Sequence, residues 1–416
     1  MKKLILTTLI ILLLFPFGCS KPLDSVDLPD LIPYRKGDKW GFCDKDKNIV
    51  IECKYDVVEQ FHDGLALVES NYRRDYIDKN GNELGMNKYV WIGSFHDSMA
   101  KVLDDRGCGF VNKKGEEIIK TQYKWVSSFS EGYALINTYD KGIGVINKSG
   151  DEFLFEKYNY IFKFRDGMAR VNIDGFVCPT LLDKGEEELE ISGGKWGFLN
   201  QDLEEIIPPS YLYCCNFKNG FSIAIKESGG KYGFINKAGE EITPFKFYEL
   251  HDFNGGFAAV KLQDRWGFIN EQGDLITEQR FFYVHDFRNG YAGVMMDNFK
   301  WGFINSNGDM VIPAKFKEVG DFSEGLAAVK LHYKWCFVDT NGNEIIPAKF
   351  DSVEEFSEGM AVVSLIDKDG FIDKQGQVTI SIKYDACYSF LNGLAKVKLN
   401  GKWGYIDKNG TEYWEE

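Results

Sequence analysis

The side chains that could carry chemistry are few, and they do not converge into a catalytic set. Among the five histidines, His62 with His96 and His251 with His285 form two pairs that occupy equivalent positions of successive repeats. The two members of a pair could therefore line up across one groove. A zinc site needs three or four converging ligands, and the sequence places no such set together. We interpret the histidines as surface residues and predict no metal or other cofactor.

No stretch matches the motifs of common hydrolases or nucleotide-binding enzymes. The chain has neither Gly-x-Ser-x-Gly nor His-Glu-x-x-His, and Gly142-Ile-Gly144 is part of a repeat without helical periodicity after it. The turn at Asp78 lacks the EF-hand spacing, which requires Gly at the sixth and Glu at the twelfth position. Paired glutamates such as Glu240-Glu241 recur in register with the repeat, so we expect them at solvated edges. The sequence predicts a protein that is not an enzyme.

One acidic segment interrupts the repeats and is a candidate binding loop. It extends from Asn172 to Gly194, and loops on rigid scaffolds often carry function. A tolerated expansion of a surface loop without a role is the alternative. The carboxylates that we select as binding residues are Asp183, Glu186, Glu187 and Glu188.

The first 18 residues have the composition of an export signal. Two lysines precede an apolar run from Leu4 to Phe17, which is too short for a membrane-spanning helix of roughly 20 residues. Gly18-Cys19 resembles the lipobox of bacterial lipoproteins. The resemblance implies cleavage before Cys19 and attachment of lipid to its thiol, with residues 19–30 as a lipidated tether. An ordinary signal peptide that is cut elsewhere is the alternative.

The rest of the chain repeats one unit eleven times. Its core reads Lys-Trp-Gly-Phe, as in Lys300-Trp-Gly-Phe303. When the copies are aligned on the residue after Trp-Gly, nine of the ten steps lie within two residues of 34, and the tenth contains the insertion. Such a period is typical of tandem-repeat architectures. The landmarks are residues 42, 76, 110, 145, 198, 234, 268, 303, 337, 371 and 405.

Each unit predicts a three-stranded antiparallel meander. Three short runs rich in β-branched and aromatic residues are separated by turn signals, for example residues 326–331, 335–339 and 344–347. Between the last two runs, nine of the eleven units have Gly, which suits the left-handed position of a short hairpin. Lys47 and Leu203 replace this Gly in the other two units.

The connector between units has the most regular signal in the chain. A phenylalanine occupies one position in all ten connectors, and another aromatic residue stands six positions before it. A single meander of this size cannot bury both rings, so neighbouring units must share them. We predict that these rings form the core between units. The connector phenylalanines are Phe61, Phe95, Phe129, Phe164, Phe217, Phe253, Phe287, Phe322, Phe356 and Phe390.

These motifs together resemble one family. Lys-Trp-Gly-Phe-Ile-Asp-Lys-x-Gly, followed by Ile-Ile-Pro-x-Lys-Phe and Phe-Ser-Glu-Gly-Leu-Ala-x-Val, is similar to the WG-repeat (KWG-type β-repeat) family of bacteria. The resemblance covers about residues 31–416. It implies an all-β repeat array, often exported or lipid-anchored, and it brings no substrate or catalytic residue.

The predicted fold is all-β, with about eleven tandem 34-residue meanders. WG repeats 1–4 would occupy residues 31–171, the acidic insertion 172–194 and WG repeats 5–11 residues 195–416. The meanders could close into a propeller-like ring or continue as an open superhelical array. Propellers usually have about 4–8 blades, and no blade completed by both chain ends is visible, which favours the open array modestly. Two smaller rings divided at the insertion are a further possibility.

The sequence favours a lipoprotein of the bacterial cell envelope that acts as a binding scaffold. Its formal net charge of −14 disfavours nucleic acid as a partner, because few cations would be left to replace counterions on phosphates. We expect a membrane contact through the lipid on Cys19 and an envelope protein as partner. A glycan or peptidoglycan binder is the alternative, with Trp91 and Trp125 as exposed sugar platforms, and a hydrolase is a distant third.

Overall fold

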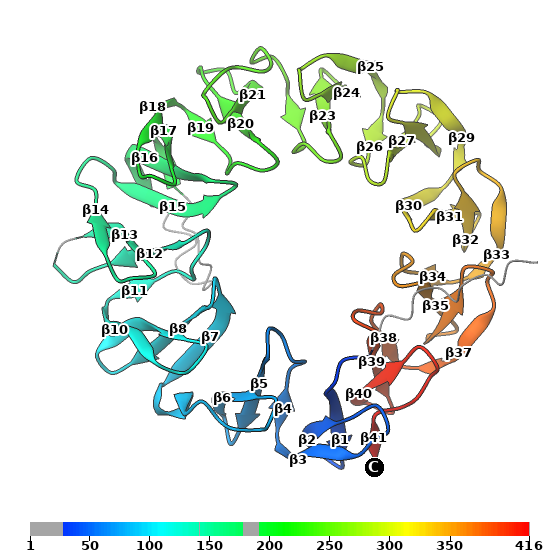
Figure 1. The fold of residues 1–416 in the computed structure, drawn as a ribbon. Coiled ribbons are helices and arrows are strands. Elements are labelled where there is room, and N and C mark those ends of the chain that lie inside the picture. The colour runs from blue at the N-terminus through cyan, green and yellow to red at the C-terminus, as the bar shows by residue number, and fades with distance from the viewer. Residues whose placement is uncertain (1–27, 141, 178–190, 416) are drawn as a thin grey trace, which may run out of the picture.

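The repeats form a closed ring of small β-sheets, a propeller with eleven blades (Figure 1). This computed structural model describes residues 28–140, 142–177 and 191–415. Within them, all but one of the elements are strands, the exception being the 3-10 helix η1 (Met86–Lys88). The all-β prediction is confirmed.

The strands of the first six blades follow one another in chain order. They are, for blade 1, β1 (Ile32–Lys36), β2 (Lys39–Cys43) and β3 (Ile49–Tyr55); for blade 2, β4 (Val57–Val58), β5 (Leu65–Ser70) and β6 (Arg73–Asp78); for blade 3, β7 (Trp91–His96), β8 (Met99–Asp104), β9 (Gly107–Asn112) and β10 (Glu117–Tyr123); for blade 4, β11 (Trp125–Val126), β12 (Tyr133–Asn137), β13 (Ile143–Asn147) and β14 (Glu152–Leu154); for blade 5, β15 (Tyr160–Arg165), β16 (Met168–Val177), β17 (Ile191–Asn200) and β18 (Glu205–Tyr211); for blade 6, β19 (Tyr213–Cys214), β20 (Phe221–Ile225) and β21 (Tyr232–Asn236).

The remaining five blades continue the same order. They are, for blade 7, β22 (Glu249–Leu250), β23 (Phe257–Leu262), β24 (Arg265–Asn270) and β25 (Leu275–Phe281); for blade 8, β26 (Tyr283–Val284), β27 (Tyr291–Met295), β28 (Trp301–Asn305) and β29 (Met310–Phe316); for blade 9, β30 (Glu318–Ser323), β31 (Leu326–Leu331), β32 (Lys334–Asp339) and β33 (Glu344–Phe350); for blade 10, β34 (Ser352–Val353), β35 (Met360–Leu365), β36 (Lys368–Asp373) and β37 (Val378–Tyr384); for blade 11, β38 (Ala386–Cys387), β39 (Leu394–Leu399) and β40 (Lys402–Asp407), followed by β41 (Trp414–Glu415).

Most blades have four strands rather than the three predicted for each unit. The connector supplies the extra strand: in blade 9, Glu318 of β30 pairs with Lys330 and Val319 pairs with Val329. The physical reason is that connector backbone groups need hydrogen-bond partners, and the free edge of the second strand offers them. In the four-stranded blades other than blade 1, the connector strand lies toward the inside of the ring and the fourth strand toward the outside (Figure 1), whereas the extra strand of blade 1 is β41.

The chain ends meet, and this contact closes the ring. Strand β41 pairs in parallel with β1 through Arg35 with Trp414 and Lys36 with Glu415, and the Gly37 N–H donates to the Glu415 carbonyl at 3.0 Å. Of the arrangements that the sequence left open, the structure therefore shows the single ring. The shared blade was not visible in the sequence because only two residue pairs form this ladder.

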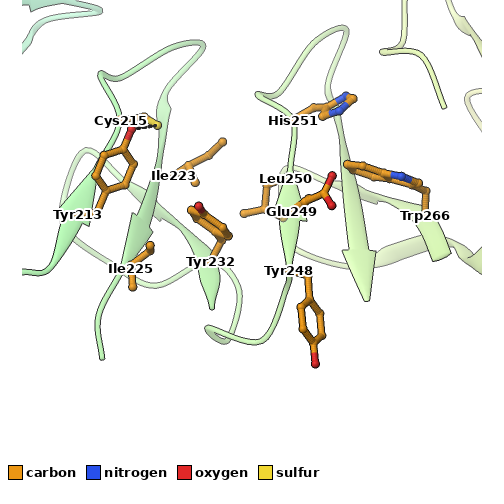
Figure 2. A pocket seen from close by; sticks show the side chains of 10 residues that line it. All are labelled: Tyr213, Cys215, Ile223, Ile225, Tyr232, Tyr248, Glu249, Leu250, His251 and Trp266. Atoms are coloured by element: carbon orange, nitrogen blue, oxygen red, sulfur yellow. Dashed lines mark hydrogen bonds between the residues drawn. The ribbon is translucent and has the colours of Figure 1, made fainter. Parts of the chain in front are cut away.

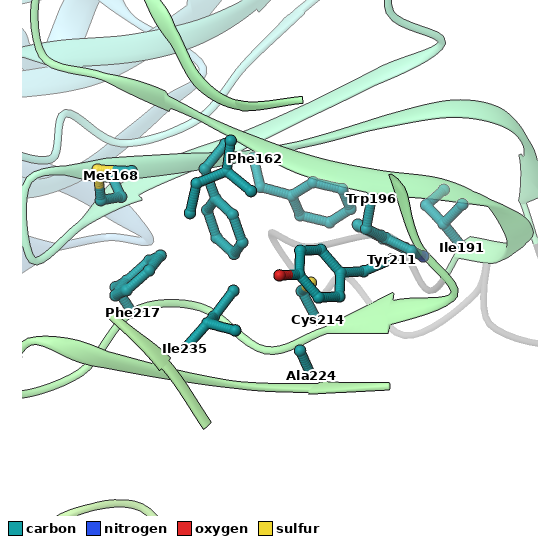
Figure 3. Packing of buried hydrophobic residues seen from close by; sticks show 11 residues of the cluster. Phe162, Met168, Ile191, Trp196, Tyr211, Cys214, Phe217, Ala224 and Ile235 are labelled. Atoms are coloured by element: carbon teal, nitrogen blue, oxygen red, sulfur yellow. The ribbon is translucent and has the colours of Figure 1, made fainter. Parts of the chain in front are cut away.

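The connector phenylalanine and the aromatic residue six positions before it share a buried cluster, as Phe322 and Phe316 do, but the ring pairs that the phenylalanine forms are with another residue. In nine of the ten connectors the phenylalanine packs on the landmark ring of the preceding blade, with centroids 4.7–5.0 Å apart. Val145 takes the landmark position in the remaining case. Figure 3 shows one such interface, where Phe162 and Trp196 of blade 5 share a cluster with Phe217 of blade 6.

The turn that follows the strand with the Trp-Gly core is built in the same way in all eleven units. An Asp or Asn that ends the third strand accepts backbone N–H groups two and four residues later, as Asp339 does from Asn341 and Asn343. The residue three positions after it has positive φ, and this includes Lys47 and Leu203, both at 64°. Both residues thus occupy the left-handed conformation that Gly adopts in the other units.

Candidate functional site

The two tryptophans predicted as sugar platforms are brought together on neighbouring blades. Trp91 begins β7 and Trp125 begins β11, and both of these strands lie on the inner side of the ring (Figure 1). The Lys101 ammonium lies 5.5 Å from the Trp91 ring centroid and 5.6 Å from that of Trp125. Trp91 is 43% exposed and Trp125 is half-buried. A cation between two indole rings is a favourable arrangement, so Lys101 couples the two tryptophans.

The same repeat position, four residues before the connector phenylalanine, carries further aromatic residues. It holds Tyr160, Tyr213 and Tyr283 in blades 5, 6 and 8. Tyr213 is 39% exposed and Tyr283 is 55% exposed. We call the set of these three tyrosines and the two tryptophans, Trp91 and Trp125, the inner belt. Sequence reasoning missed the three tyrosines, although extending the register of the two tryptophans would have found them.

A cavity of about 470 Å³ lies where the inner belt passes from blade 6 to blade 7. Figure 2 shows Tyr213 and Tyr232 on one side and Glu249, His251 and Trp266 on the other. Burial, with a smaller contribution from the neighbouring thiol, raises the pKa of Tyr213 to about 12. Its hydroxyl therefore stays protonated at neutral pH and can donate or accept a hydrogen bond. The cavity offers apolar rings with a few polar groups at its edge, which is the usual composition of a binding site.

The second histidine pair occupies the next cavity along the ring. His251 and His285 both line a space of about 460 Å³, so the groove that the sequence left open for this pair exists. The His251 ring packs on Trp266 with centroids 4.7 Å apart, and its Nδ1 lies 2.6 Å from Asp286 Oδ1. Burial raises the pKa of the Asp286 carboxyl, but the hydrogen bond to His251 and the electrostatic attraction of His251, Lys218 and Arg288 together outweigh this effect, so the pKa is lowered overall.

His285 repeats the arrangement one blade later, and the first histidine pair lies elsewhere. The His285 ring packs on Trp301 with centroids 4.5 Å apart, and its Nδ1 is 3.7 Å from Asp321. His62 and His96 line a separate cavity of about 440 Å³. Among the residues that the structure describes, no three His, Cys, Asp or Glu side chains are placed to hold a metal ion. His251 and His285 thus each stack on a tryptophan and face an aspartate of the next blade.

The residues predicted for acidic binding and for lipid attachment lie outside the described part of the chain. These are Asp183, Glu186, Glu187 and Glu188, together with Cys19. The described residues of the insertion, 172–177 and 191–194, extend β16 and β17, which pair from Met168 with Asn200 to Val177 with Ile191. Blade 5 therefore spans the insertion, which does not divide two rings.

The structure describes seven cysteines. All seven are free thiols, and five of them are buried. Cys43, Cys108 and Cys336 are buried within the repeat core, where Cys108 stands in the Trp position and Cys336 in the Gly position of Trp-Gly. Burial raises the pKa of the Cys43 thiol to about 12, so it stays protonated and acts as a packing residue.

The repeat sequence decides the family. The model for the WG containing repeat matches residues 40–73, 109–141, 143–175, 196–231, 232–266, 266–298, 301–335, 337–368 and 370–403. The chain belongs to the WG-repeat family. No curated protein matches it by sequence. No helix among the described residues of this WG-repeat protein is both long and apolar enough to cross a membrane.

Solved structures with overall likeness to this WG-repeat protein are distant. The extracellular domain of a hybrid two-component system from B. thetaiotaomicron has 10% identity and a TM-score of 0.24, covering 91% of this chain and 69% of that one. BamB from Moraxella catarrhalis has 9% identity and a TM-score of 0.29, covering 77% and 92%. An Hsv2 variant with a replaced loop has 10% identity and a TM-score of 0.31, covering 61% and 96%.

Proposed function

We propose that this WG-repeat protein is an exported, lipid-anchored scaffold of the bacterial cell envelope that binds an envelope protein without catalysing a reaction. The observation that carries the proposal is the inner belt. Three of its side chains, those of Trp91, Tyr213 and Tyr283, are 39–55% exposed, although ring pairs such as Phe303 with Phe322 already supply the aromatic packing between blades. Exposed Tyr and Trp residues are enriched at protein interfaces, because they bury a large area while retaining one polar group.

The anchor is the second part of the proposal. The apolar run up to Phe17 and the Gly18-Cys19 pair support export and lipid attachment. Radiolabelled palmitate supplied to cells that produce the full chain should appear on the protein and disappear with Cys19→Ser. Label that persists in Cys19→Ser would contradict the assignment of this residue.

A photo-crosslinking amino acid placed in the inner belt tests the binding part. The probe at Trp91 or at Tyr213 should give the same discrete protein adduct in intact cells. The matched control is Leu275, which is 52% exposed on the outer strand β25. An adduct from Leu275 alone, or none from either inner position, would contradict a binding surface on the inside of the ring.

A glycan is the second candidate, and the exposed indole of Trp91 is the observation that favours it. Sugars stack on aromatic faces, although Lys101 already lies over this ring. Purified insoluble cell wall should then retain the protein, and Trp91→Ala should abolish retention. Equal retention of Trp91→Ala and the parent protein would exclude this role for the residue.

A further inference from the structure

The two rims of the ring differ in their exposed side chains. We count strands from the inside of the ring, so that β1, β2 and β3 of blade 1 occupy the second, third and fourth positions. In every blade, the turn from the second to the third strand then lies on the same rim as the crossover to the next blade. We call it the apolar rim. The turns from the first to the second strand and the Asp/Asn hairpins lie on the opposite rim, which we call the acidic rim. This division follows from the antiparallel strand order of the blades.

The most exposed hydrophobic residues of the described chain gather on the apolar rim. Eight large hydrophobic residues are more than 60% exposed, and seven of them, at 61–98%, lie on this rim. Leu391 on the acidic rim is the exception, at 65%. Single exposed apolar residues are ordinary, but a concentration on one face is informative. The seven residues are Tyr72, Val90, Tyr139, Phe176, Phe299, Tyr333 and Ile366.

These side chains stand at blade tips spread around the ring rather than in one patch. Tyr72, Tyr333 and Ile366 occupy the turns of blades 2, 9 and 10, and Tyr139 and Phe299 occupy those of blades 4 and 8. A partner that covers them together must be at least as wide as the ring and nearly flat. A lipid bilayer is such a surface, and aromatic and aliphatic side chains are favoured at its interface.

Among the described residues, charge distinguishes the rims in the same direction, whereas the acidic part of the insertion, which joins β16 to β17, lies outside those residues. On the apolar rim, Lys or Arg begins the third strand in most blades, and several of these cations pair with crossover carboxylates, as Lys334 does with Asp351 at 2.5 Å. On the acidic rim, Glu324 and Glu358 pair with Lys374 and Lys408, but the Asp/Asn hairpins of blades 5, 7, 8 and 9 (residues 200–204, 270–274, 305–309 and 339–343) contain carboxylates and neither Lys nor Arg. An acidic rim is repelled by anionic headgroups, whereas a rim of balanced charge is not.

The position at which the described chain begins is compatible with either rim facing a membrane. Leu28 packs into the cluster between blades 11 and 1, and Asp30 pairs with Lys79 of an acidic-rim hairpin at 2.7 Å. Nine residue steps separate Leu28 from Cys19, and such a segment can extend about 30 Å. A six-residue strand is about 20 Å long. A lipid on Cys19 can therefore reach a membrane beneath the apolar rim.

We propose that the apolar rim docks on a lipid bilayer, so that the ring lies flat on the membrane with its acidic rim turned away. The inference rests on the proposed location at the envelope, but not on attachment of lipid to Cys19. Tyr, Phe, Ile and Val tips would enter the headgroup region, while the paired charges at the turns stay hydrated.

Sedimentation with vesicles tests this proposal on the ring without its lipid. Residues 28–416 include all eleven sheets and their clusters, so this unit contains its own core. The ring should sediment with vesicles of phosphatidylethanolamine and phosphatidylglycerol. The triple variant Tyr72→Ser, Tyr333→Ser, Ile366→Ser should reduce the bound fraction at least about tenfold, because three apolar anchors are lost. Leu391→Ser is the matched control and should bind as the parent does.

Unfolding in urea should be unchanged in all these variants, since the substituted side chains are exposed and far from the core. A parent ring that stays in the supernatant at millimolar lipid would overturn the inference and leave the rim to a protein partner. Equal binding of the triple variant and the parent would also overturn it. Palmitate labelling of Cys19 is a separate readout, so a failure of the anchor would be distinguished from a failure of rim docking.

Discussion

Closure of the ring depends on a short C-terminal segment, and Tyr413→Ala is the sharpest test of it. Tyr413 is fully buried between blades 11 and 1, where it packs with Ile32, Tyr34 and Leu394. Burying a tyrosine removes about 150–200 Å² from water, which corresponds to about 4 kcal/mol of stability. The Tyr413 hydroxyl also donates to Asp407 at 3.3 Å, a bond worth about 1 kcal/mol.

Urea unfolding followed by tryptophan fluorescence measures the loss. Tyr413→Ala should lower the unfolding free energy of the first transition by about 4 kcal/mol, while Tyr413→Phe, which keeps the ring, should cost about 1 kcal/mol or less. Hydrogen exchange adds a local readout, because the Gly37 N–H donates to the Glu415 carbonyl. Its exchange should accelerate when residues 412–416 are deleted. A cost below about 1 kcal/mol for Tyr413→Ala, or unchanged Gly37 exchange, would refute a ring closed by this segment.

Three further predictions address the blades themselves. Phe322→Ala should cost about 3–5 kcal/mol, because its ring lies between two blades; a loss under about 1 kcal/mol in urea would contradict that placement. Lys47→Gly should stabilise the protein by about 0.5–1 kcal/mol by relieving a left-handed backbone, and Gly410→Lys should destabilise it by a similar amount; opposite signs in the same assay would contradict the strain. A hydrogen bond from the Arg106 guanidinium lowers the pKa of Asp104 to about 2 in the folded protein, below the unfolded value near 3.9. The ionised Asp104 therefore stabilises the fold above about pH 4, and this contribution is lost as the pH falls toward 2. Asp104→Asn should therefore weaken the decline of the urea midpoint between pH 4 and 2, and an unchanged decline would contradict the assignment.

The architecture could be predicted from the sequence because each of its determinants occurs about ten times. One connector phenylalanine says little, but ten at one spacing require a shared environment, and the ring pairs such as Phe303 with Phe322 provide it. The hairpin could be predicted for the same reason. Even its exceptions follow the rule, since Lys47 and Leu203 keep the positive φ of the glycine that they replace.

Features that occur once could not be predicted in this way. The parallel pairing of β41 with β1 involves two residue pairs, too few for a pattern, and it brings together residues from both ends of the chain. The connector strand, which is the innermost strand of most blades, was also missed. Its short segments, such as Ser352–Val353, have no alternation that separates them from a loop.

The candidate site was predicted in part, because its residues vary at positions that the framework leaves free. Two residues before the connector phenylalanine, neighbouring blades carry Ser127, Phe162, Cys215, His251 and His285 in turn. Packing between blades fixes the phenylalanine, whereas this position lies on or directly after the inner strand and ranges from the buried Phe162 and Ser127 to the half-buried His251 and His285. Variation on a constant framework is how a rigid scaffold acquires specificity. The ligand of this protein is therefore to be sought at the inner positions that differ from blade to blade, and the invariant aromatic core explains only why they are held in place.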